Sequence, residues 1–600
     1  MTRDVVPDGQ GVPGNPASVA RTLLAYALKL EIEAQEPRER DAVGVTAGRR
    51  IPSDQWGDRI RFRLGRRPGR RIKPGVRVRL ELEGLPPRPA RILQWDGREV
   101  LLSTELPFGT PIPDGQLIED SRWIMQSLRW KLLSSLRGRH DQLGLALLGM
   151  DMPQHRSTPQ HVQVPRDLNG EQQEAVRRGL DPGLCLIQGP PGTGKSRTIG
   201  AMVDAAVRSG RSVLCVAPSN VATDLVLDSV CTRFEVGRPR LEEGRVIRLG
   251  GVASESLRER WQSVVDPWII AGRRVSEPAD MASVREEVRR VVSSAAVLVT
   301  TVARTHLVDL HRRFDLVVVD EAVMTSLPSL YHVGTMVVAG GGLVLIGDPF
   351  QLPVVARSSH PFVHTLHARD PFRILASDRG VRADHGSRIV RLRTQYRMDS
   401  QIAELANAMV YGDLATHPTV RQRLPLANPW REKHLVLVDS SGLPGVRGRA
   451  GRYDNAVHAE LIARMLRCPD VLGHRQGGDI AVLCRYRDQV EAIRAKAPHR
   501  PDLLVDTVHA MQGAEAHTVI LDLSACQEHS FPGDYLQDAG PDEVGARLMT
   551  VALTRARRRL VVVADLPFLL AHPDIPPQAL SRRLLEYLQA HAARWKASLG

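Results

Sequence analysis

The chain has 600 residues, 42% of them hydrophobic, and a formal net charge of +14 at pH 7. This length predicts about three to five domains, the apolar content is enough for packed cores, and the charge favours a polyanionic partner. The six cysteines include no C-x-x-C pair, which indicates buried thiols of a reduced compartment and argues against a zinc site or a disulfide framework. Because no apolar run is long enough to span a membrane and no signal peptide is visible, we expect a soluble cytoplasmic protein.

Residues 1–40 are predicted to form a tail followed by a helix. The tail, residues 1–16, is rich in Gly, Pro and Asp, a composition that disfavours packing. From residue 17 to 35 apolar residues recur at helical spacing. They centre on Leu23, Leu24, Leu28 and Ile32.

Residues 41–150 are predicted to form an accessory domain. Apolar and polar residues alternate over 59–64 and 76–82, and Asp96-Gly97 stands between two further apolar runs. A period of two with a tight-turn dipeptide predicts a small antiparallel β-barrel. Helical spacing returns over 119–137, and there we expect the tryptophans to pack in a core rather than to stack on bases. The residues on that side are Trp123, Leu128, Trp130 and Leu132.

One face of the predicted barrel is strongly basic. Its members, with no acid between them, are Arg59, Arg61, Arg63, Arg66, Arg67, Arg70, Arg71, Lys73, Arg77 and Arg79. Like charges at this density repel one another unless a polyanion screens them. We therefore expect nucleic-acid contact at Arg66, Arg67, Arg70 and Arg71, and a merely solvated face is the alternative.

From residue 168 onward the pattern changes to strands that are apolar on both faces and alternate with helices. Such strands are typical of parallel sheets covered by helices on both sides, and two such series follow one another. The expected boundaries are a Pro-containing linker at 151–167, a first sheet domain at 168–388 with a helical insert at about 251–294, a second sheet domain at 389–566, and a C-terminal helix within 567–600.

A glycine-rich loop follows the first apolar strand of this region and leads into a predicted helix. The loop is Gly189-Pro190-Pro191-Gly192-Thr193-Gly194-Lys195-Ser196. Strand, loop and helix in this order are the context of a Walker A phosphate loop, in which glycines turn backbone N–H groups toward phosphates. We expect ATP here, with Lys195 at the β and γ phosphates, Ser196 on Mg²⁺, and the positive end of the helix dipole adding to the attraction.

Two further strand ends carry groups suited to phosphoryl transfer. Asp320-Glu321 ends the strand at 316–319, at the edge where open parallel sheets hold ligands. Asp320 is a candidate for orienting Mg²⁺ and Glu321 for polarising the attacking water. Gln351 follows the strand at 343–346 and is a candidate for coupling the γ phosphate to the second sheet domain.

Three later segments complete a known series of motifs. They are Gln395-Tyr396-Arg397-Met398, Gln512-Gly513-Ala514-Glu515 and Val551-Ala552-Leu553-Thr554-Arg555-Ala556. Together with the phosphate loop and the acid pair they resemble superfamily 1 helicases, and among these the 1B branch typified by the nonsense-mediated-decay RNA helicase and its immunoglobulin-mu-binding relatives. The resemblance covers about residues 168–564 and extends loosely to 59–137.

The resemblance implies an α/β fold class, with two tandem RecA-like parallel-sheet motor domains preceded by a small antiparallel β-barrel on a helical stalk. It implies an ATP- and Mg²⁺-dependent motor in which Gln172 reads the adenine edge and Tyr396 stacks near the base. Arg397 and Arg555 would be arginine fingers, and Gly513 and Glu515 would lie near the ribose. Guanidinium groups fit that role because they stabilise charge spread over a transferring phosphoryl group.

For a nucleic-acid strand the resemblance implies contacts at strand ends. The residues are Pro218, Ser219, Asn220, Thr300, Thr301 and Thr507. Hydroxyls and amides suit phosphate and sugar contacts that position a strand without reading its sequence, although a threonine at a strand end can equally be a simple cap. Departures from the family pattern include His458, where a glutamate is common, and none of them removes a catalytic group.

The function implied is an ATP-dependent helicase or translocase on single-stranded RNA or DNA, moving 5′ to 3′. The alternative is an ATP-gated nucleic-acid clamp or ribonucleoprotein remodeller that does not unwind duplexes, since such motifs indicate coupled ATP hydrolysis rather than strand separation.

Overall fold

The computed structural model describes residues 15–35, 42–51, 58–65, 77–84, 88–96, 98–104, 112–119, 122–134, 141–149, 164–235, 245–250, 252, 255–265, 290, 292–377, 389–421, 433–443, 454–467, 479–511, 513–525, 532–540 and 543–596. The chain divides into two compact units. The barrel unit comprises Met1–Gly138, His306–Asp309 and Val355–Ala368, and the two-sheet unit comprises Arg139–Thr305, Leu310–Val354 and Arg369–Gly600.

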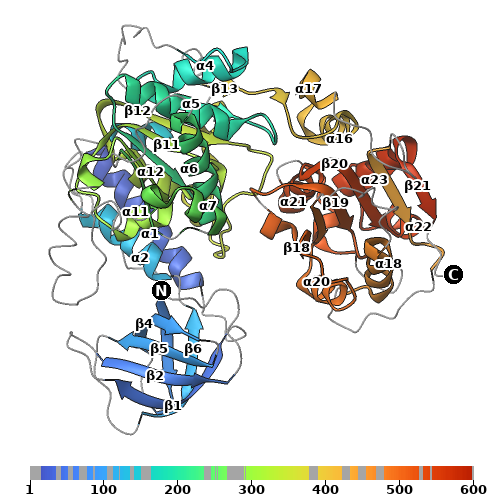
Figure 1. Ribbon diagram of the computed structural model, residues 1–600, viewed down its shortest axis with the longest axis horizontal. Helices are drawn as coiled ribbons and strands as arrows, with labels where there is room; N and C mark the ends of the chain where they lie inside the picture. The colour runs from blue at the N-terminus through green and yellow to red at the C-terminus, as the bar shows by residue number, and fades with distance from the viewer. Residues whose placement is uncertain are drawn as a thin grey trace. The chain divides into compact units, whose positions relative to one another are not determined.

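The strands of the barrel unit form a closed antiparallel barrel (Figure 1). In chain order they are β1 (Val43–Ile51), β2 (Asp58–Leu64), β3 (Arg77–Leu82), β4 (Arg88–Trp95), β5 (Glu99–Thr104) and β6 (Gly115–Glu119). Their order around the barrel is β1-β2-β5-β4-β3-β6, and β6 pairs with β1 to close it. The predicted barrel is therefore confirmed. At the β4–β5 turn Asp96 Oδ1 accepts the amides of Arg98 and Glu99, and these bonds lower the pKa of Asp96.

Alternation along the strands turns apolar side chains into the barrel and arginines away from it. In β2, Phe62 is fully buried whereas Arg61 is exposed. Arg61 Nη1 lies 3.7 Å from a carboxylate oxygen of Glu99. Arg79 Nη2 lies 2.5 Å from Glu81. Because these acids come from elsewhere in the strands, the outer face is less uniformly basic than the run of arginines in the sequence suggested.

Helices complete the barrel unit. They are α1 (Pro16–Ala34), α2 (Arg122–Ser134) and α13 (Pro361–Leu366). On α2, Leu128 and Leu132 are buried, but Trp130 is 68% exposed. The expectation that this tryptophan packs in a core is wrong, because two residues along a helix correspond to a rotation of about 200° and place Trp130 opposite both leucines.

A buried carboxylate joins α1 to the segment that precedes α13. Glu31 is 0% exposed, and its oxygens accept the backbone amides of Arg357 at 3.0 Å and Ser358 at 3.0 Å. Tyr26 of α1 also meets Phe362 edge to face, with ring centroids 5.7 Å apart. These contacts make residues 355–368 an integral part of the barrel unit.

The first sheet of the two-sheet unit is parallel, in the order β13-β7-β12-β11-β8-β10-β9. Its strands are β7 (Gly183–Gln188), β8 (Val213–Ala217), β9 (Val246–Leu249), β10 (Val297–Thr301), β11 (Phe314–Val319), β12 (Val337–Gly347) and β13 (Ile389–Arg391). The accompanying helices are α3 (Gln142–Leu147), α4 (Gly170–Gly179), α5 (Lys195–Arg208), α6 (Asn220–Glu235), α7 (Glu255–Arg260), α8 (Gln262–Val265), α11 (Val302–Leu307), η3 (Ala322–Met324), α12 (Leu327–Gly334) and α14 (Pro371–Ser377). All five residues of β8 are buried, as expected for a strand that is covered on both faces.

The second sheet is also parallel, in the order β18-β17-β19-β20-β16-β21. Its strands are β16 (Leu435–Asp439), β17 (Ile480–Cys484), β18 (Leu503–Thr507), β19 (Ala516–Asp522), β20 (Ala556–Ala564) and β21 (Ala593–Lys596). A separate pair consists of β14 (Thr394–Gln395) and β15 (Ala415–Thr416), and the helices are α16 (Ser400–Ala406), η4 (Asn407–Tyr411), α17 (Pro418–Arg421), α18 (Ala456–Arg467), α20 (Arg487–Arg494), η5 (Val508–Met511), η6 (Asp534–Leu536), α21 (Val544–Leu553), α22 (Leu566–Ala571) and α23 (Leu580–His591).

Three predicted boundaries need correction. The first sheet does not end at 388, because β13 pairs with β7. The predicted accessory domain does not extend to 150, because α3 belongs to the two-sheet unit, where Gly144 packs so closely on the ring of Tyr331 that a Cβ would lie 2.8 Å away. Residues 567–600 are more than a terminal helix, because β21 pairs with β16 at the edge of the second sheet. Most of the predicted helical insert lies outside the described residues.

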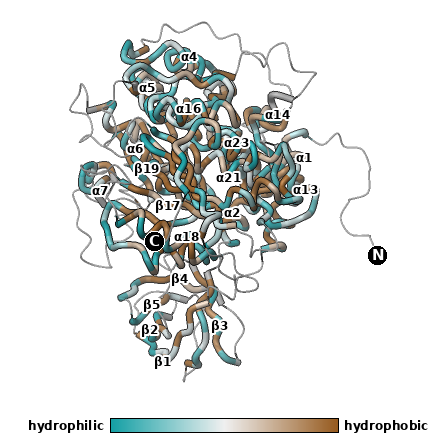
Figure 2. The backbone as a smooth tube through the Cα atoms, turned by 90° about the vertical axis from the view of Figure 1, so that its right-hand side faces the viewer, coloured by the Kyte–Doolittle hydropathy of each residue, from teal (hydrophilic) through white to brown (hydrophobic). Residues whose placement is uncertain are grey.

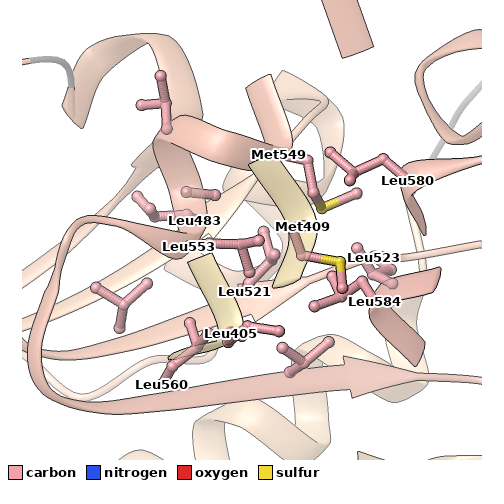
Figure 3. Packing of buried hydrophobic residues seen from close by; sticks show 14 of the residues in the cluster. Leu405, Met409, Leu483, Leu521, Leu523, Met549, Leu553, Leu560, Leu580 and Leu584 are labelled. Atoms are coloured by element: carbon pink, nitrogen blue, oxygen red, sulfur yellow. The ribbon is translucent and has the colours of Figure 1, made fainter. Parts of the chain in front are cut away.

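The core on one face of the second sheet explains why the C-terminal helices belong to it. Figure 3 shows Leu580 and Leu584 of α23 beside Met409 of η4 and Met549 of α21, and all four side chains are buried in one cluster. The strands β17 and β19 beneath are among the most hydrophobic segments of the chain (Figure 2). The four cysteines that are described are buried and form no disulfide with one another. No described helix is both long and apolar enough to traverse a membrane.

On the other side of the second sheet, a buried polar network surrounds His458. Its Nε2 lies 2.7 Å from Ser440 Oγ and its Nδ1 lies 2.7 Å from Asp522 Oδ1. Gln489 Nε2 donates to the other oxygen of Asp522 at 2.5 Å. All four residues are at most 7% exposed. The structure thus explains the departure at His458, since a glutamate here would face the buried carboxylate of Asp522.

Candidate nucleotide-binding site

The glycine-rich loop connects β7 to α5, in the context that the sequence predicted. Lys195 is the first residue of α5, and its Nζ donates to the carbonyl oxygen of Gly189 at 2.8 Å. Thr193 Oγ1 donates to the carbonyl of Pro190 at 2.8 Å. These bonds brace the loop across its own width, so that its backbone holds a preformed cradle for phosphates.

Two glycines of the loop have backbone angles that favour glycine. Gly192 has φ +78° and Gly194 has φ +80°. A Cβ on Gly192 would lie 2.5 Å from Cβ of Arg397, and one on Gly194 would lie 2.6 Å from Nε2 of Gln172. Glycine is therefore required here both by conformation and by the close approach of two other predicted site residues.

Gln172 joins the start of α4 to the phosphate loop. Its Oε1 accepts the backbone amide of Asn169 at 3.2 Å, and Asn169 caps the helix in return. Its Nε2 donates to the carbonyl oxygen of Thr193 at 3.0 Å. Each end of this amide makes one hydrogen bond within the protein, which leaves one Nε2 hydrogen and one Oε1 lone pair for an adenine edge.

The acid pair lies at the end of β11. Asp320 is 5% exposed, and its Oδ1 has no hydrogen-bond partner among the described residues. Burial, followed by the negative charge of Glu321, raises the pKa of Asp320 to about 7, although Lys195 acts in the opposite direction. An orphaned, buried carboxylate oxygen facing a phosphate loop fits the ligand set of Mg²⁺, which favours a carboxylate together with substrate phosphates. The next residue, Glu321, has φ +50°.

Gln351 connects the first sheet to Arg555, which follows α21. Gln351 Oε1 accepts from Arg555 Nη2 at 3.0 Å, and its Nε2 donates to Asp348 Oδ2 at 2.9 Å. Tyr411 donates its hydroxyl to the same oxygen of Asp348 at 2.6 Å. Burial raises the pKa of Asp348. The predicted coupling residue therefore lies at the centre of a hydrogen-bond network that links the two sheet domains.

Arg555 is held by protein acceptors on three sides. Besides Gln351, its Nε donates to Val551 O at 3.1 Å and its Nη1 donates to Ala514 O at 3.1 Å. Burial, and secondly the charge of Arg397, lower the pKa of Arg555 to about 10. The guanidinium is thus still charged near neutral pH.

The second predicted arginine finger, Arg397, contacts a carboxylate. Its Nε lies 2.5 Å from Glu515 Oε2, and its Nη1 donates to Thr554 O at 3.3 Å. The neighbouring Tyr396 donates its backbone amide to Gly192 O at 2.7 Å, so the arginine follows a direct backbone link to the phosphate loop. Glu515, expected near the ribose, lies between Arg397 and Arg557.

These groups surround one cavity of about 350 Å³. It is lined by Pro190, Pro191, Gly192, Gly194, Lys195, Ser196, Arg197, Ala222, Leu225, Asp320, Glu321, Gln351, Tyr396, Arg397, Gly513, Glu515, Arg555 and Arg557. The phosphate loop, both carboxylates and both predicted arginine fingers thus open into the same space. Of the nucleotide residues predicted from sequence, Gln172, Gly189 and Thr193 are not in contact with the cavity and act behind it, on the loop itself.

Sequence reasoning missed several functional candidates. Arg197 and Arg557 line the cavity, and Asp348 and Tyr411 hold Gln351. Arg557 could have been inferred, because it lies only two residues after Arg555, at the start of β20. Tyr411 lies in a helical turn with no motif signal, so only the fold reveals it.

Comparisons with known proteins agree with these motifs. Three models of AAA-domain families match the chain, at residues 167–283, 261–422 and 378–566. The DNA-binding protein SMUBP-2 of Rattus norvegicus is 27% identical over 469 residues, which cover 71% of this chain and 45% of the relative. The RNA helicase Mov10l1 of Homo sapiens is 27% identical over 439 residues, which cover 68% of this chain and 34% of the relative.

The chain is similar to superfamily 1 helicases.

The chain also resembles the DNA replication ATP-dependent helicase/nuclease JHS1 of Arabidopsis thaliana, at 27% identity over 68% of this chain and 29% of the relative. The chain therefore spans less than half the length of these curated relatives. Among solved structures, the arterivirus nonstructural protein 10 (helicase) matches 91% of this chain and 80% of its own, with 14% identity and a TM-score of 0.37. That likeness is too distant to add to the assignment.

The predicted strand contacts of the chain differ in accessibility. Ser219 and Asn220 are exposed at the start of α6, and Pro218 before them is half-buried. Thr301, at the end of β10, and Thr507, at the end of β18, are half-buried. Thr301 Oγ1 accepts the Arg304 amide at 3.2 Å.

Thr300 is a correction to the sequence prediction. It is 0% exposed, and its hydroxyl donates to the carbonyl oxygen of Leu249 at 2.8 Å. The side chain is turned toward β9, the neighbouring edge strand, and cannot touch a strand of nucleic acid in this arrangement. The alternative reading of a strand-end cap fits this threonine. The predicted contacts Arg66, Arg67, Arg70 and Arg71 lie outside the described residues.

Proposed function

We propose that this protein is an ATP-dependent motor that moves along single-stranded nucleic acid and unwinds duplexes. The observation that carries the proposal is the cavity of about 350 Å³ shared by the phosphate loop, Glu321 and Arg555. Arginines supplied to a phosphate loop from a second domain stabilise the charge of the transferring phosphoryl group. Hydrolysis would then depend on how the two sheet domains meet, which is the requirement for a motor.

In this proposal the substrate ATP binds with its triphosphate on the loop. Lys195 neutralises the β and γ phosphates, and Ser196 and Asp320 hold Mg²⁺, which supplies further positive charge at the phosphates. Glu321 orients the attacking water, because it is the carboxylate beside Asp320 on the same cavity wall. Tyr396 and Gln172 serve the base.

Gln351 would couple hydrolysis to movement. It accepts a hydrogen bond from Arg555 at 3.0 Å. A γ phosphate is a stronger, charged acceptor for the same guanidinium. Exchange of Arg555 between Gln351 and phosphate would therefore change the contact between the two domains once in each ATP cycle.

The strand would lie along the strand ends that carry Pro218, Ser219, Asn220, Thr301 and Thr507. Polar groups of this kind grip phosphate and sugar without reading sequence. The names of the relatives include both DNA-binding and RNA helicase proteins, so the proposed partner is single-stranded RNA or DNA. The proposed direction is 5′ to 3′ and the proposed location is the cytoplasm.

Single-strand-stimulated ATP hydrolysis is the first test. Oligo(U) and oligo(dT) should raise ATP turnover, and Lys195→Ala and Glu321→Gln should abolish it. A fully active Lys195→Ala variant would refute the site assignment. No response of turnover to either strand would refute the motor.

Strand displacement is the second test. Because the motor motifs indicate coupled ATP hydrolysis rather than strand separation, an ATP-gated clamp or ribonucleoprotein remodeller is the alternative. Labelled duplexes with 5′ or 3′ overhangs discriminate the two. Release of the labelled strand from the 5′-overhang duplex alone is expected, and stimulated hydrolysis without release from either duplex would favour the clamp.

The basic segment at residues 66–71 requires its own test. Replacing Arg66 and Arg67 by glutamate should weaken strand binding and reduce its salt dependence, since fewer counterions are then released. The matched control replaces Arg464 and Arg467, two exposed arginines of α18, by glutamate and changes the net charge equally. Equal effects in both variants would show that the basic segment serves solubility alone. Arg70 and Arg71 form the second pair to be exchanged.

A further inference from the structure

A fully buried arginine lies beneath the proposed strand contacts at the start of α6. Arg248 belongs to the edge strand β9, and its side chain is 0% exposed. Burying a guanidinium is costly unless its donors are bonded. Its hydrogen-bond partners therefore show what the residue holds in place.

Those partners come from two elements. Arg248 Nη2 donates to Asn220 Oδ1 at 3.0 Å and lies 3.4 Å from Asp224 Oδ1, both on α6. Its Nη1 donates to the carbonyl oxygen of Leu249 at 2.8 Å. The same carbonyl accepts the hydroxyl of Thr300, from β10. One side chain thus joins the first turn of α6 to the ends of β9 and β10.

The bond to Asn220 fixes which way its amide faces. A guanidinium can only donate, so the group that meets Arg248 must be the amide oxygen of Asn220. The Nδ2 hydrogens then point elsewhere, and no acceptor for them occurs within the described residues. Asn220 is itself exposed. It therefore presents donors to solvent at the start of a 16-residue helix, where the dipole also favours negative charge.

We propose that Arg248 is a positioning residue for nucleic acid, which holds Asn220 with its amide donors toward a backbone phosphate and ties that contact to the ends of β9 and β10. This inference rests on the proposed motor function. Arg248 does not reach the phosphate. It acts by preventing the amide from rotating, and the shared Leu249 carbonyl makes the position of Asn220 depend on β10. The ligand is the phosphate group of a single strand, whichever sugar it carries.

Charge and geometry separate this role from a direct phosphate contact. A cation that touches phosphate contributes to counterion release, so its loss reduces the salt slope of binding by about 1. Loss of a buried arginine that acts through a neutral amide leaves the slope unchanged while affinity falls. We expect about a tenfold rise in half-saturating strand concentration, the factor that follows from one hydrogen bond to a charged group.

The experiment compares Arg248→Met, Asn220→Ala and the double variant in ATPase assays with oligo(dT) and oligo(U). For Arg248→Met we expect half-saturation by the strand to rise about tenfold, with basal turnover and the KM for ATP within about twofold of wild type. The double variant should be no weaker than Asn220→Ala alone, because both changes remove the same contact. Arg248→Lys keeps the charge without the fork and should restore only part of the affinity.

Arg248→Met removes the positive charge beside the buried carboxylate of Asp224, so Arg248→Met/Asp224→Leu, which removes both buried charges, is measured alongside. Arg559→Met, which deletes a fully buried arginine of β20, controls for general loss of stability. Additive losses in the double variant, unchanged half-saturation, or an equal fall in basal turnover would each overturn the inference while leaving the motor intact. A wild-type protein that binds neither strand would overturn the motor and the inference together.

Discussion

Arg555→Met should abolish ATP hydrolysis without preventing ATP binding. The guanidinium is 2% exposed and still charged near neutral pH, it lines the nucleotide cavity, and its Nη2 lies 3.0 Å from Gln351 Oε1. Methionine keeps most of the buried length and removes the fork. The variant therefore separates a catalytic guanidinium from one that merely fills space.

The two roles predict effects of different size. An arginine finger contributes about 10³–10⁵ in kcat, which corresponds to about 4–7 kcal/mol at about 1.4 kcal/mol per tenfold. If Arg555 were only structural, its loss would leave Gln351 Oε1 and two backbone carbonyls without this donor. Each buried group left unsatisfied costs about 1–3 kcal/mol of folding stability, but the rate constant of folded protein would change little.

Single-turnover hydrolysis at saturating ATP and Mg²⁺ measures the chemical step, and a fluorescent ATP analogue measures binding. Arg559→Met is the matched control, because burial also lowers the pKa of Arg559 to about 10 but its side chain does not line the cavity. Thermal unfolding of both variants reports stability. The reasoning fails if Arg555→Met keeps its single-turnover rate within about tenfold of wild type, or if the two variants lose the same amount.

Three further predictions follow from individual contacts. Gly192→Ala should weaken ATP binding strongly, because its Cβ would collide with Arg397. Gly412→Ala is the control: it has a similar φ of +79° but open space around it, so it should reduce stability alone. Equal ATP affinities of the two variants would contradict the collision with Arg397. His458→Ala should lower the free energy of unfolding by about 1–3 kcal/mol, which is measured as a fall in Tm. His458→Glu should lower it further, because the new carboxylate would face Asp522. A higher Tm for His458→Glu than for His458→Ala would argue against the network. Trp130→Ala should leave Tm within about 1 °C of wild type, because an exposed surface residue contributes little to stability, and a fall of several degrees would restore it to a core.

The sequence predicted the parts of the fold that depend on local pattern. The phosphate loop and the ends of β7 and β11 could be predicted, because an apolar run stops there at a glycine or an acid. The apolar runs themselves indicated strands that are covered on both faces. β13 and β21 were missed because short edge strands carry little apolar signal. Arg594 and Lys596 even interrupt β21 with charge.

Site residues that belong to a motif with one known role could be predicted from the sequence. Residues whose role depends on whether their side chain is exposed could not. Lys195, Asp320 and Arg555 meet in one cavity because each belongs to a motif with a fixed place in the fold. Thr300 differs because the exposure of its hydroxyl depends on β9, a strand distant in sequence. Arg248 carried no signal at all, since an arginine within a four-residue strand is ordinarily a surface residue.

The carboxylate of Glu31 has a consequence for how this protein can be dissected. Residues 355–368 follow Gln351 closely in the chain but belong to the barrel unit. There Glu31 of α1 accepts the backbone amides of Arg357 and Ser358. Cutting away residues 1–138 would therefore not release a clean catalytic fragment. The backbone amides of Arg357 and Ser358 would lose their acceptor Glu31, and the ring of Phe362 would lose its contact with Tyr26. A shortened enzyme that is inactive would then report a broken segment next to its coupling residue, and only a point change in the barrel itself can report what the barrel does.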